Sequence, residues 1–250
     1  MSVLVLDVDL GAGVGAWFTG RDPDGPPRAV GSPGNLSHRR PHHPAALAAD
    51  RTEVGRHIGH PPDRWVTMHQ VHDARVGVVD TSTPPGAEVR GVDALVTAER
   101  DRPLAVSTAD CVPVLLAGAH TIGAAHAGRK GVQAGVVAAA LRAMADLGDA
   151  PAEIRAVVGP AIGGCCYEVP VAMYDEVVAA HPAAAAMTIW DTPALDLPAA
   201  VSAQLAEAGV TDVQRLGTCT RCDDRARWFS HRADPGTGRQ FGLIVRQAAR

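Results

Sequence analysis

The sequence predicts a mixed α/β fold, and three observations indicate it. Short apolar runs bounded by turn residues, which are typical of buried strands, recur along most of the chain. Longer amphipathic stretches, which are typical of helices, lie between some of these runs. Strand-like and helix-like segments alternate without the regular period of a barrel or a dinucleotide-binding fold, so we expect a mixed sheet.

The expected strands follow the apolar runs in chain order. They are 3–6, 65–68, 74–79, 93–97, 104–107, 112–117, 122–125, 154–158, 213–216 and 241–245. Between them, apolar residues on one face predict helices at 45–58, 132–147, 169–180 and 193–208. The glycine-rich stretch at 11–15 lacks the amphipathic helix that follows a phosphate-binding loop, so we interpret it as a turn. Residues 20–44 are rich in Gly, Pro, Arg and His, which predicts a long loop.

Composition narrows the class of protein. The 250 residues include 46% hydrophobic and 20% charged residues, which is typical of a soluble globular chain. The net charge of −4 and the aromatic content of only 4% argue against a nucleic-acid partner. No apolar run is long enough to span a membrane, and the N-terminus has no basic segment of a signal peptide. We therefore expect a cytoplasmic protein with no membrane partner.

Two reactive side chains lie close to the ends of central strands. Cys111 stands between the expected strands 104–107 and 112–117, and His126 directly follows 122–125. Side chains at strand ends can converge on one point, so this pair suits a nucleophile with its base or a metal site. A buried thiol beside a satisfied histidine is the other interpretation. His69 and His72 are three residues apart, so only one of them is expected to point to such a site.

The start of the 132–147 helix indicates an anion site. Arg129 and Lys130, the chain's only lysine, lie in the turn just before it. Free N–H groups and the helix dipole favour an anion at a helix N-terminus. A solvated basic turn is the alternative.

The chain has five cysteines, and four of them lie outside the central stretch. Adjacent cysteines are awkward as two ligands of one ion, and no second C-x-x-C pair matches the first. We therefore expect these four thiols to be structural or incidental: Cys165, Cys166, Cys219 and Cys222.

A set of motifs in fixed order resembles the laccase-domain or polyphenol oxidase family of the YfiH type. Its members are also described as purine nucleoside phosphorylases and peptidoglycan editing factors. The matching segments are FTGRDPDG (18–25), MHQVHDARV (68–76), DALVT (93–97), STADCVPVLL (107–116), AAHAGRKG (124–131), GPAIGGCCYEV (159–169), CT (219–220) and FSHRADPGTGRQ (229–240). They span almost the whole chain, which makes the set far more specific than any one motif.

The resemblance implies one layered α/β domain over residues 1–250, a monomer or weak homo-oligomer. It also implies that His72, Cys111 and His126 are the catalytic residues and bind one zinc ion. Two imidazoles and one thiolate leave a fourth tetrahedral position open, as in catalytic zinc sites.

Three functions follow from the family, and they remain distinct hypotheses. The first is a zinc-dependent purine nucleoside phosphorylase acting on adenosine, inosine or methylthioadenosine with phosphate, and accompanied by adenosine deaminase activity. The second is a peptidoglycan-editing or binding protein that keeps the zinc ligands without nucleoside turnover. The third is a copper polyphenol oxidase. Since three ligands cannot hold a multicopper cluster, zinc is the expected metal and copper the alternative.

The motifs also supply expected substrate- or phosphate-binding residues. These are Asn35, Gln70, Asp110, Arg129, Lys130 and Arg239. The sequence departs from the family in three places. Arg129 and Lys130 replace the usual Trp and Arg, Ala233 replaces an Arg, and the N-terminal loop lacks the full Gly-Gly and Ser-Leu-Asn-Leu run. An aromatic plane and a bidentate cation are thereby lost, which bears on substrate choice more than on the metal site.

Overall fold

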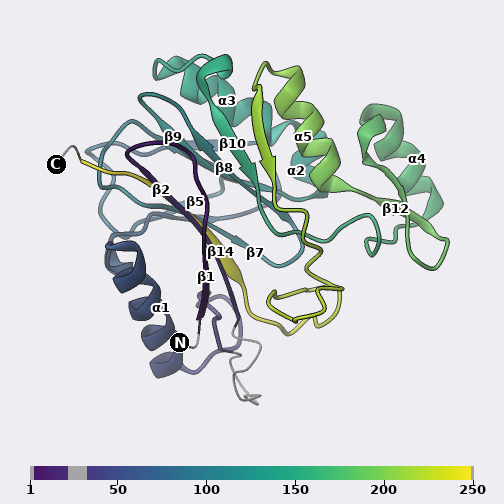
Figure 1. The fold of residues 1–250 in the computed structure, drawn as a ribbon, viewed down its shortest axis with the longest axis horizontal. Coiled ribbons are helices and arrows are strands. Elements are labelled where there is room, and N and C mark those ends of the chain that lie inside the picture. Colours follow the sequence, from purple (N-terminus) through teal and green to yellow (C-terminus); the bar gives the residue numbers. More distant parts are fainter. Residues whose placement is uncertain (1–2, 22–32, 249–250) are drawn as a thin grey trace.

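Two β-sheets pack face to face at the centre of the molecule, and helices cover their outer faces (Figure 1). The description comes from a computed structural model and covers residues 3–21 and 33–248. Three apolar clusters fill the spaces between successive layers, one between the sheets and one beneath the helices on each side. The predicted mixed α/β class is confirmed.

The first sheet has four antiparallel strands in the order β1-β2-β14-β7. Their bounds are Val3–Asp7 for β1, Val14–Arg21 for β2, Gln240–Arg246 for β14 and Leu104–Thr108 for β7. The last strand of the chain therefore lies inside this sheet, between β2 and β7.

The second sheet has six strands in the order β13-β10-β8-β9-β6-β4. Their bounds are Asp212–Arg215 for β13, Arg155–Val158 for β10, Val112–Ala117 for β8, Ile122–Ala127 for β9, Ala94–Thr97 for β6 and Val76–Val78 for β4. The two outer pairs are parallel and the inner pairs antiparallel, so the sheet is mixed. Three of the four inner strands, β6, β8 and β9, are buried throughout, which explains their continuous apolar sequences.

Helices cover both outer faces. Helix α1 (Pro44–Ile58) packs on the four-stranded sheet, whereas α3 (Val136–Asp146) and α5 (Leu197–Glu207) pack on the six-stranded sheet (Figure 1). Two further helices are α2 (Arg129–Ala134) and α4 (Val171–Ala180). Smaller pairs are formed by β3 (Thr67–His69) with β5 (Glu88–Arg90), and by β11 (Ala185–Met187) with β12 (Pro193–Leu195). None of the described helices is long and apolar enough to cross a membrane.

Several expected boundaries were wrong. The expected helix 132–147 is two helices, because Gly135 adopts a left-handed conformation (φ 80°) between α2 and α3. The expected helix 193–208 begins as β12, and α5 starts only after Asp196, whose side chain accepts the N–H of Ala199. Strands β2, β5 and β11 were not expected. Of the expected loop 20–44 and the quoted FTGRDPDG segment, residues 22–32 lie outside the described residues.

Candidate metal centre and its cavity

The three predicted metal ligands converge on one point. His72 lies between β3 and β4, Cys111 directly precedes β8, and His126 lies in β9. Their ligand atoms all lie within 4.8 Å of one another, and Cys111 Sγ is 3.9 Å from His72 Nε2. The two imidazole rings stand edge to face, with centroids 4.8 Å apart. The structure thus brings together the His–Cys–His set.

The path of the chain between the two sheets places Cys111. Strand β7 belongs to the four-stranded sheet and β8 to the six-stranded sheet, so the short link at 109–111 passes from one sheet to the other. His126 pairs with Pro113 across the β8–β9 ladder, which sets its side chain close to that link. The site therefore lies where the two sheets diverge at one end of the sandwich.

A buried carboxylate, Asp93, holds two of the ligands in place. Its side chain is fully buried and accepts the backbone N–H groups of Val71, His72 and Asp73 at 2.9–3.0 Å. It also pairs with His126 Nδ1 at 2.7 Å, which leaves Nε2 of that ring as the ligand atom. A carboxylate behind a histidine ligand fixes the tautomer and raises the basicity of the ring. Asp93 was missed as a site residue in the sequence, where it was only the first residue of an expected strand.

Two non-glycine residues beside the ligands have left-handed backbone. His72 has φ 63° and Asp110, which precedes Cys111, has φ 87°. Such conformations cost about 1–3 kcal/mol and persist only where the surroundings impose them. Asp93 imposes the first, and the Asp110 carboxylate is itself fixed by Thr220 Oγ1 and the N–H of Arg232, both at 2.6 Å. The strained backbone at these two positions therefore orients two of the three ligands, His72 and Cys111.

Gly128 leaves the space that the ligands occupy. A Cβ at this position would lie 2.9 Å from His72 Cδ2 and 3.0 Å from Cys111 Sγ. Such contacts are too close for real side chains, so any other residue would push the ligands apart. Close packing against His72 and Cys111 therefore explains why glycine occupies position 128.

The thiol and the imidazoles influence each other's protonation. Burial would raise the pKa of Cys111, but the charge of His126 and hydrogen bonds from His126 and His72 outweigh it and lower the pKa to about 6. Burial would lower the pKa of His126, but Cys111 and Asp93 raise it to about 9. The donors thus favour a thiolate, the form that binds a metal. With two imidazoles, one thiolate and a histidine-orienting carboxylate, this donor set fits a metal ion.

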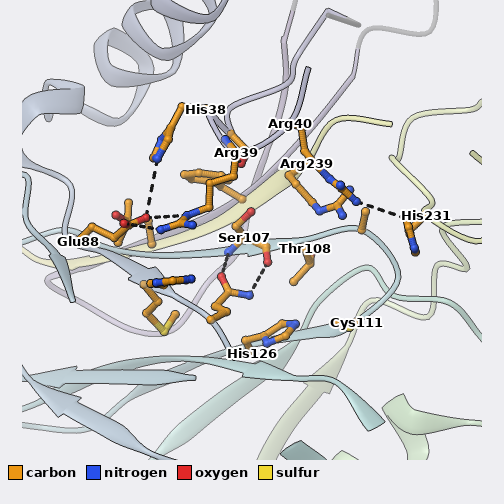
Figure 2. A pocket seen from close by; sticks show the side chains of 18 of the residues that line it. His38, Arg39, Arg40, Glu88, Ser107, Thr108, Cys111, His126, His231 and Arg239 are labelled. Atoms are coloured by element: carbon orange, nitrogen blue, oxygen red, sulfur yellow. Dashed lines mark hydrogen bonds and ion pairs between the residues drawn. The ribbon is translucent and has the colours of Figure 1, made fainter. Parts of the chain in front are cut away.

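A cavity of about 430 Å³ opens beside the three ligands (Figure 2). All three line it, together with residues of β3, β7, α1 and the segment before α1. Its walls carry several cations, which are Arg39, Arg40, Arg51 and Arg239. His69 lines it as well, but of these two histidines only His72 belongs to the ligand group, as the three-residue spacing predicts.

Arg40 and Arg239 in the cavity wall have no ion-pair partner among the described residues, although Cys111 and Asp110 attract Arg239 from a distance. Arg39 forms an ion pair with Glu88 at 2.6 Å, but within the described residues neither Arg40 nor Arg239 pairs with a carboxylate. Burial and the charge of Arg40 lower the pKa of Arg239 to about 10, so it stays protonated at neutral pH. In the same wall, the buried hydroxyl of Thr108 has no hydrogen-bond partner within the part of the chain described. These groups suit an anionic, oxygen-rich ligand.

The structure gives three of the predicted substrate-binding residues structural partners. Gln70 lines the cavity, but its amide pairs with both the N–H and the C=O of Ser107, at 3.0 and 2.9 Å. The buried Asn35 side chain accepts the N–H groups of Ser37 and Arg239 and lies outside the cavity lining. Asp110, described above, also lies outside it. All three position neighbouring segments, and contact with substrate stays a prediction.

Arg129 and Lys130 begin helix α2 and do not line the cavity. Arg129 donates to Gln133 Oε1 at 2.7 Å and also reaches the Tyr167 hydroxyl. Burial and the nearby Cys111 thiolate raise the pKa of Tyr167. Lys130 is exposed. Their role in anion binding stays a prediction. Because neither side chain lines the cavity, they would act on an anion bound there only by electrostatic attraction over a distance.

We therefore expect a small effect from this turn. Arg129→Ala and Lys130→Ala should each weaken the binding of inorganic phosphate by less than about fivefold, since the attraction of a charge outside the cavity contributes at most about 1 kcal/mol. Calorimetric titration with phosphate measures it. An unchanged affinity in both variants would show that the turn is merely solvated.

Comparison with known proteins extends these observations. A family described as "Multi-copper polyphenol oxidoreductase laccase" matches residues 16–247. The chain is 53% identical over 204 residues to "Purine nucleoside phosphorylase SCO2081" of Streptomyces coelicolor, covering 80% of this chain and 83% of that protein. It is 49% identical over 203 residues to "Purine nucleoside phosphorylase ORF3" of Streptomyces griseus, covering 80% and 82%.

Solved structures agree. YlmD from Geobacillus stearothermophilus superposes with a TM-score of 0.85 at 31% identity, covering 95% of this chain and 93% of the other. The Bacillus licheniformis protein YfiH superposes with a TM-score of 0.81 at 29% identity, covering 93% and 92%.

Proposed function

The chain belongs to the multi-copper polyphenol oxidoreductase laccase family, and from that premise we propose that it is a zinc-dependent purine nucleoside phosphorylase. The metal would be held by His72, Cys111 and His126. The observation that supports the proposal most is that one cavity joins these donors with Arg40 and Arg239, which have no ion-pair partner among the described residues. Phosphorolysis needs phosphate held close to C1′ of the nucleoside, and a Lewis acid in the same cavity can assist by stabilising the departing purine.

Zinc suits the donors better than the copper that the family description names. Among the described residues, only one group of candidate ligands contains histidine, so a multicopper cluster has no place to form there. Two imidazoles and one thiolate beside an open cavity correspond to a catalytic zinc site with a free fourth position. A bound zinc ion would supply Lewis-acid polarisation and a water of lowered pKa.

The chain's own residues account for phosphate binding. Arg239 and Arg40 would hold phosphate by charge-assisted hydrogen bonds, and the unpartnered Thr108 hydroxyl offers one further donor. Held there, a phosphate oxygen can attack C1′ of the nucleoside as the bond from C1′ to the purine breaks. Ribose 1-phosphate and the free base are the products. The apolar wall residues Met68, Ala105 and Phe241 can bury the purine and exclude water.

Adenosine deamination accompanies phosphorolysis as a minor activity in this proposal. Zinc deaminases use a free glutamate to move the proton between water and the leaving amine. The one carboxylate among the described residues of the cavity wall is Glu88, and the hydrogen bond from Arg39 holds its pKa below the usual range. A carboxylate that is paired with an arginine and stays ionised is a poor proton donor, so we expect deamination to be slower than phosphorolysis.

The test is a panel of adenosine, inosine and methylthioadenosine, each with and without phosphate. Phosphate-dependent release of base and of ribose 1-phosphate, resolved by chromatography, is the expected result. A folded, metal-loaded protein that turns over no purine nucleoside would overturn the proposal. The peptidoglycan-editing or binding function would then take its place.

A single arginine tests the location of the phosphate site. Arg239→Gln should raise the KM for phosphate by about tenfold or more, because a charge-assisted hydrogen bond contributes roughly 1.5–3 kcal/mol. The KM for nucleoside should change far less. Arg142→Gln is the matched control, since Arg142 is exposed on α3 and lies outside the cavity lining. Equal phosphate KM values in the two variants would remove Arg239 from the site.

A further inference from the structure

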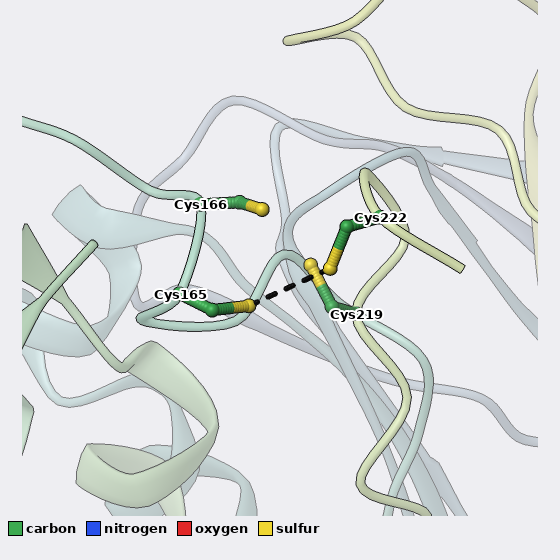
Figure 3. Close-up of side chains that lie close together, drawn as sticks. All are labelled: Cys165, Cys166, Cys219 and Cys222. Atoms are coloured by element: carbon green, nitrogen blue, oxygen red, sulfur yellow. Dashed lines mark hydrogen bonds between the residues drawn. The ribbon is translucent and has the colours of Figure 1, made fainter. Parts of the chain in front are cut away.

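The four cysteines outside the cavity form a second cluster. Cys165 and Cys166 follow strand β10, and Cys219 and Cys222 follow strand β13. These strands are parallel neighbours, so the segments after them leave the same edge of the sheet, and a bridge between Ala161 and Cys219 continues the pairing. Figure 3 shows the side chains of the four cysteines turned toward a common centre.

The distances between the sulfur atoms suit one metal ion. All four lie within 4.8 Å of one another, and Cys165 Sγ is 3.7 Å from Cys222 Sγ. In a tetrahedral zinc site with Zn–S bonds of about 2.3 Å, neighbouring sulfurs lie about 3.8 Å apart. The cluster is therefore close to that size without any ion to hold it together.

The backbone around Cys219 is arranged for a thiolate. The N–H of Gly163 donates to Cys219 Sγ at 3.3 Å. Burial would raise the pKa of this thiol, but the nearby backbone N–H groups of Gly163, Cys222 and Arg221 outweigh it and lower the pKa, which favours the charged form that binds a metal. A Cβ at position 163 would lie 3.2 Å from Cys165 Sγ, so glycine leaves room for this sulfur to turn toward the cluster.

We propose that Cys165, Cys166, Cys219 and Cys222 bind a structural zinc ion, a second metal beside the one at the triad. Four thiolates fill a tetrahedral shell and leave no position for substrate. From the sequence we expect these thiols to be structural or incidental, because the adjacent Cys165 and Cys166 are awkward as two ligands of one ion. In the folded chain, however, the two sulfurs reach one cluster from successive residues of a tight turn.

The cluster is connected to the first metal centre. Thr220 directly follows Cys219. It donates its N–H to the Ala161 carbonyl at 2.9 Å and its hydroxyl to the Asp110 carboxylate at 2.6 Å. The Asp110 carbonyl in turn accepts the N–H of Ile162 at 2.9 Å. Because Asp110 directly precedes Cys111, an ion in the cluster would brace the segment that aims this ligand.

Zinc content of the full-length chain, purified under reducing conditions, tests the proposal. Wild type should hold about two zinc ions per chain. The Cys165→Ser/Cys222→Ser variant should lose one of them and unfold at a lower temperature. Cys111→Ser is the matched control: it too removes a thiol, but it should lose the other zinc and keep the one at the cluster. Equal zinc content in wild type and the double variant would overturn the proposal.

Cobalt substitution provides a measurement that does not depend on folding of the double variant. In the Cys111→Ala background, the remaining thiolates are those of the cluster. The Co²⁺-loaded protein should show thiolate charge-transfer absorption and the intense visible bands of tetrahedral cobalt. Absence of these bands would overturn the proposal. A disulfide among the four cysteines would also overturn the proposal. The sample would be protein purified under reducing conditions that lacks the second metal, and mass spectrometry after alkylation would detect the disulfide.

Discussion

Replacing Cys111 or His72 with alanine is expected to abolish phosphorolysis, with a fall in kcat/KM of at least about 100-fold. Each side chain supplies one of three donors that lie within 4.8 Å of one another. With two donors left, the site cannot hold zinc at the concentrations present in a purified sample, so the metal content should fall by about one equivalent. Elemental analysis and the phosphate-dependent assay on the same preparation measure both effects.

The matched control for His72→Ala is His120→Ala. His120 is exposed in the turn between β8 and β9 and lies outside the cavity lining, so metal content and turnover should stay at the wild-type level. If Cys111→Ala kept full zinc and full activity, the His–Cys–His site would be excluded as the metal centre. Copper in place of zinc at the same stoichiometry would keep the site and change the metal.

Asp93→Asn should weaken the metal site without removing a ligand. The asparagine keeps the shape of Asp93 but turns an amide N–H₂ toward groups that are themselves N–H donors. His126 also loses the carboxylate that fixes its tautomer, so metal affinity should drop by roughly 10- to 100-fold. Unsatisfied buried donors should lower the free energy of unfolding by about 1–3 kcal/mol. Chelator competition and denaturant unfolding measure the two effects.

Asp73→Asn, in the same segment, is the control for charge and position. Its half-exposed carboxylate bonds only its neighbours Ala74 and Arg75, so stability should change by less than about 1 kcal/mol. If the two variants had the same metal affinity, Asp93 would be a structural residue alone, without influence on the ligands.

The parts of the fold that the sequence predicts best are those whose burial is uniform. Strands β6, β8 and β9 are continuous apolar runs because both faces are covered, and they were confirmed within a few residues. Strand β2 was missed, since Gly15 and Gly20 interrupt its pattern although nearly all of it is buried. The start of α5 was placed too early because Pro193–Leu195 is as apolar as the helix, and only the capping Asp196 separates them.

For the site, local patterns located Cys111 and His126 but not what surrounds them. Asp93 acts through contacts with residues some 20 and 33 positions away, which leave no mark on its own sequence neighbourhood. The cavity arginines likewise come from segments around 40 and 239 that meet only in the folded chain. The sequence did not predict that the four cysteines outside the cavity converge, because their convergence depends on the parallel pairing of β10 and β13.

The position of β14 has a consequence for biosynthesis. This strand contributes Phe241 to the cavity wall, follows Arg239 directly, and lies between β2 and β7 inside its sheet. Until residues 240–246 have emerged from the ribosome, β2 and β7 have no partner between them, and the arginine wall cannot assemble. The complete cavity, with the arginine wall that we propose for phosphate, can therefore form only after this strand has been translated.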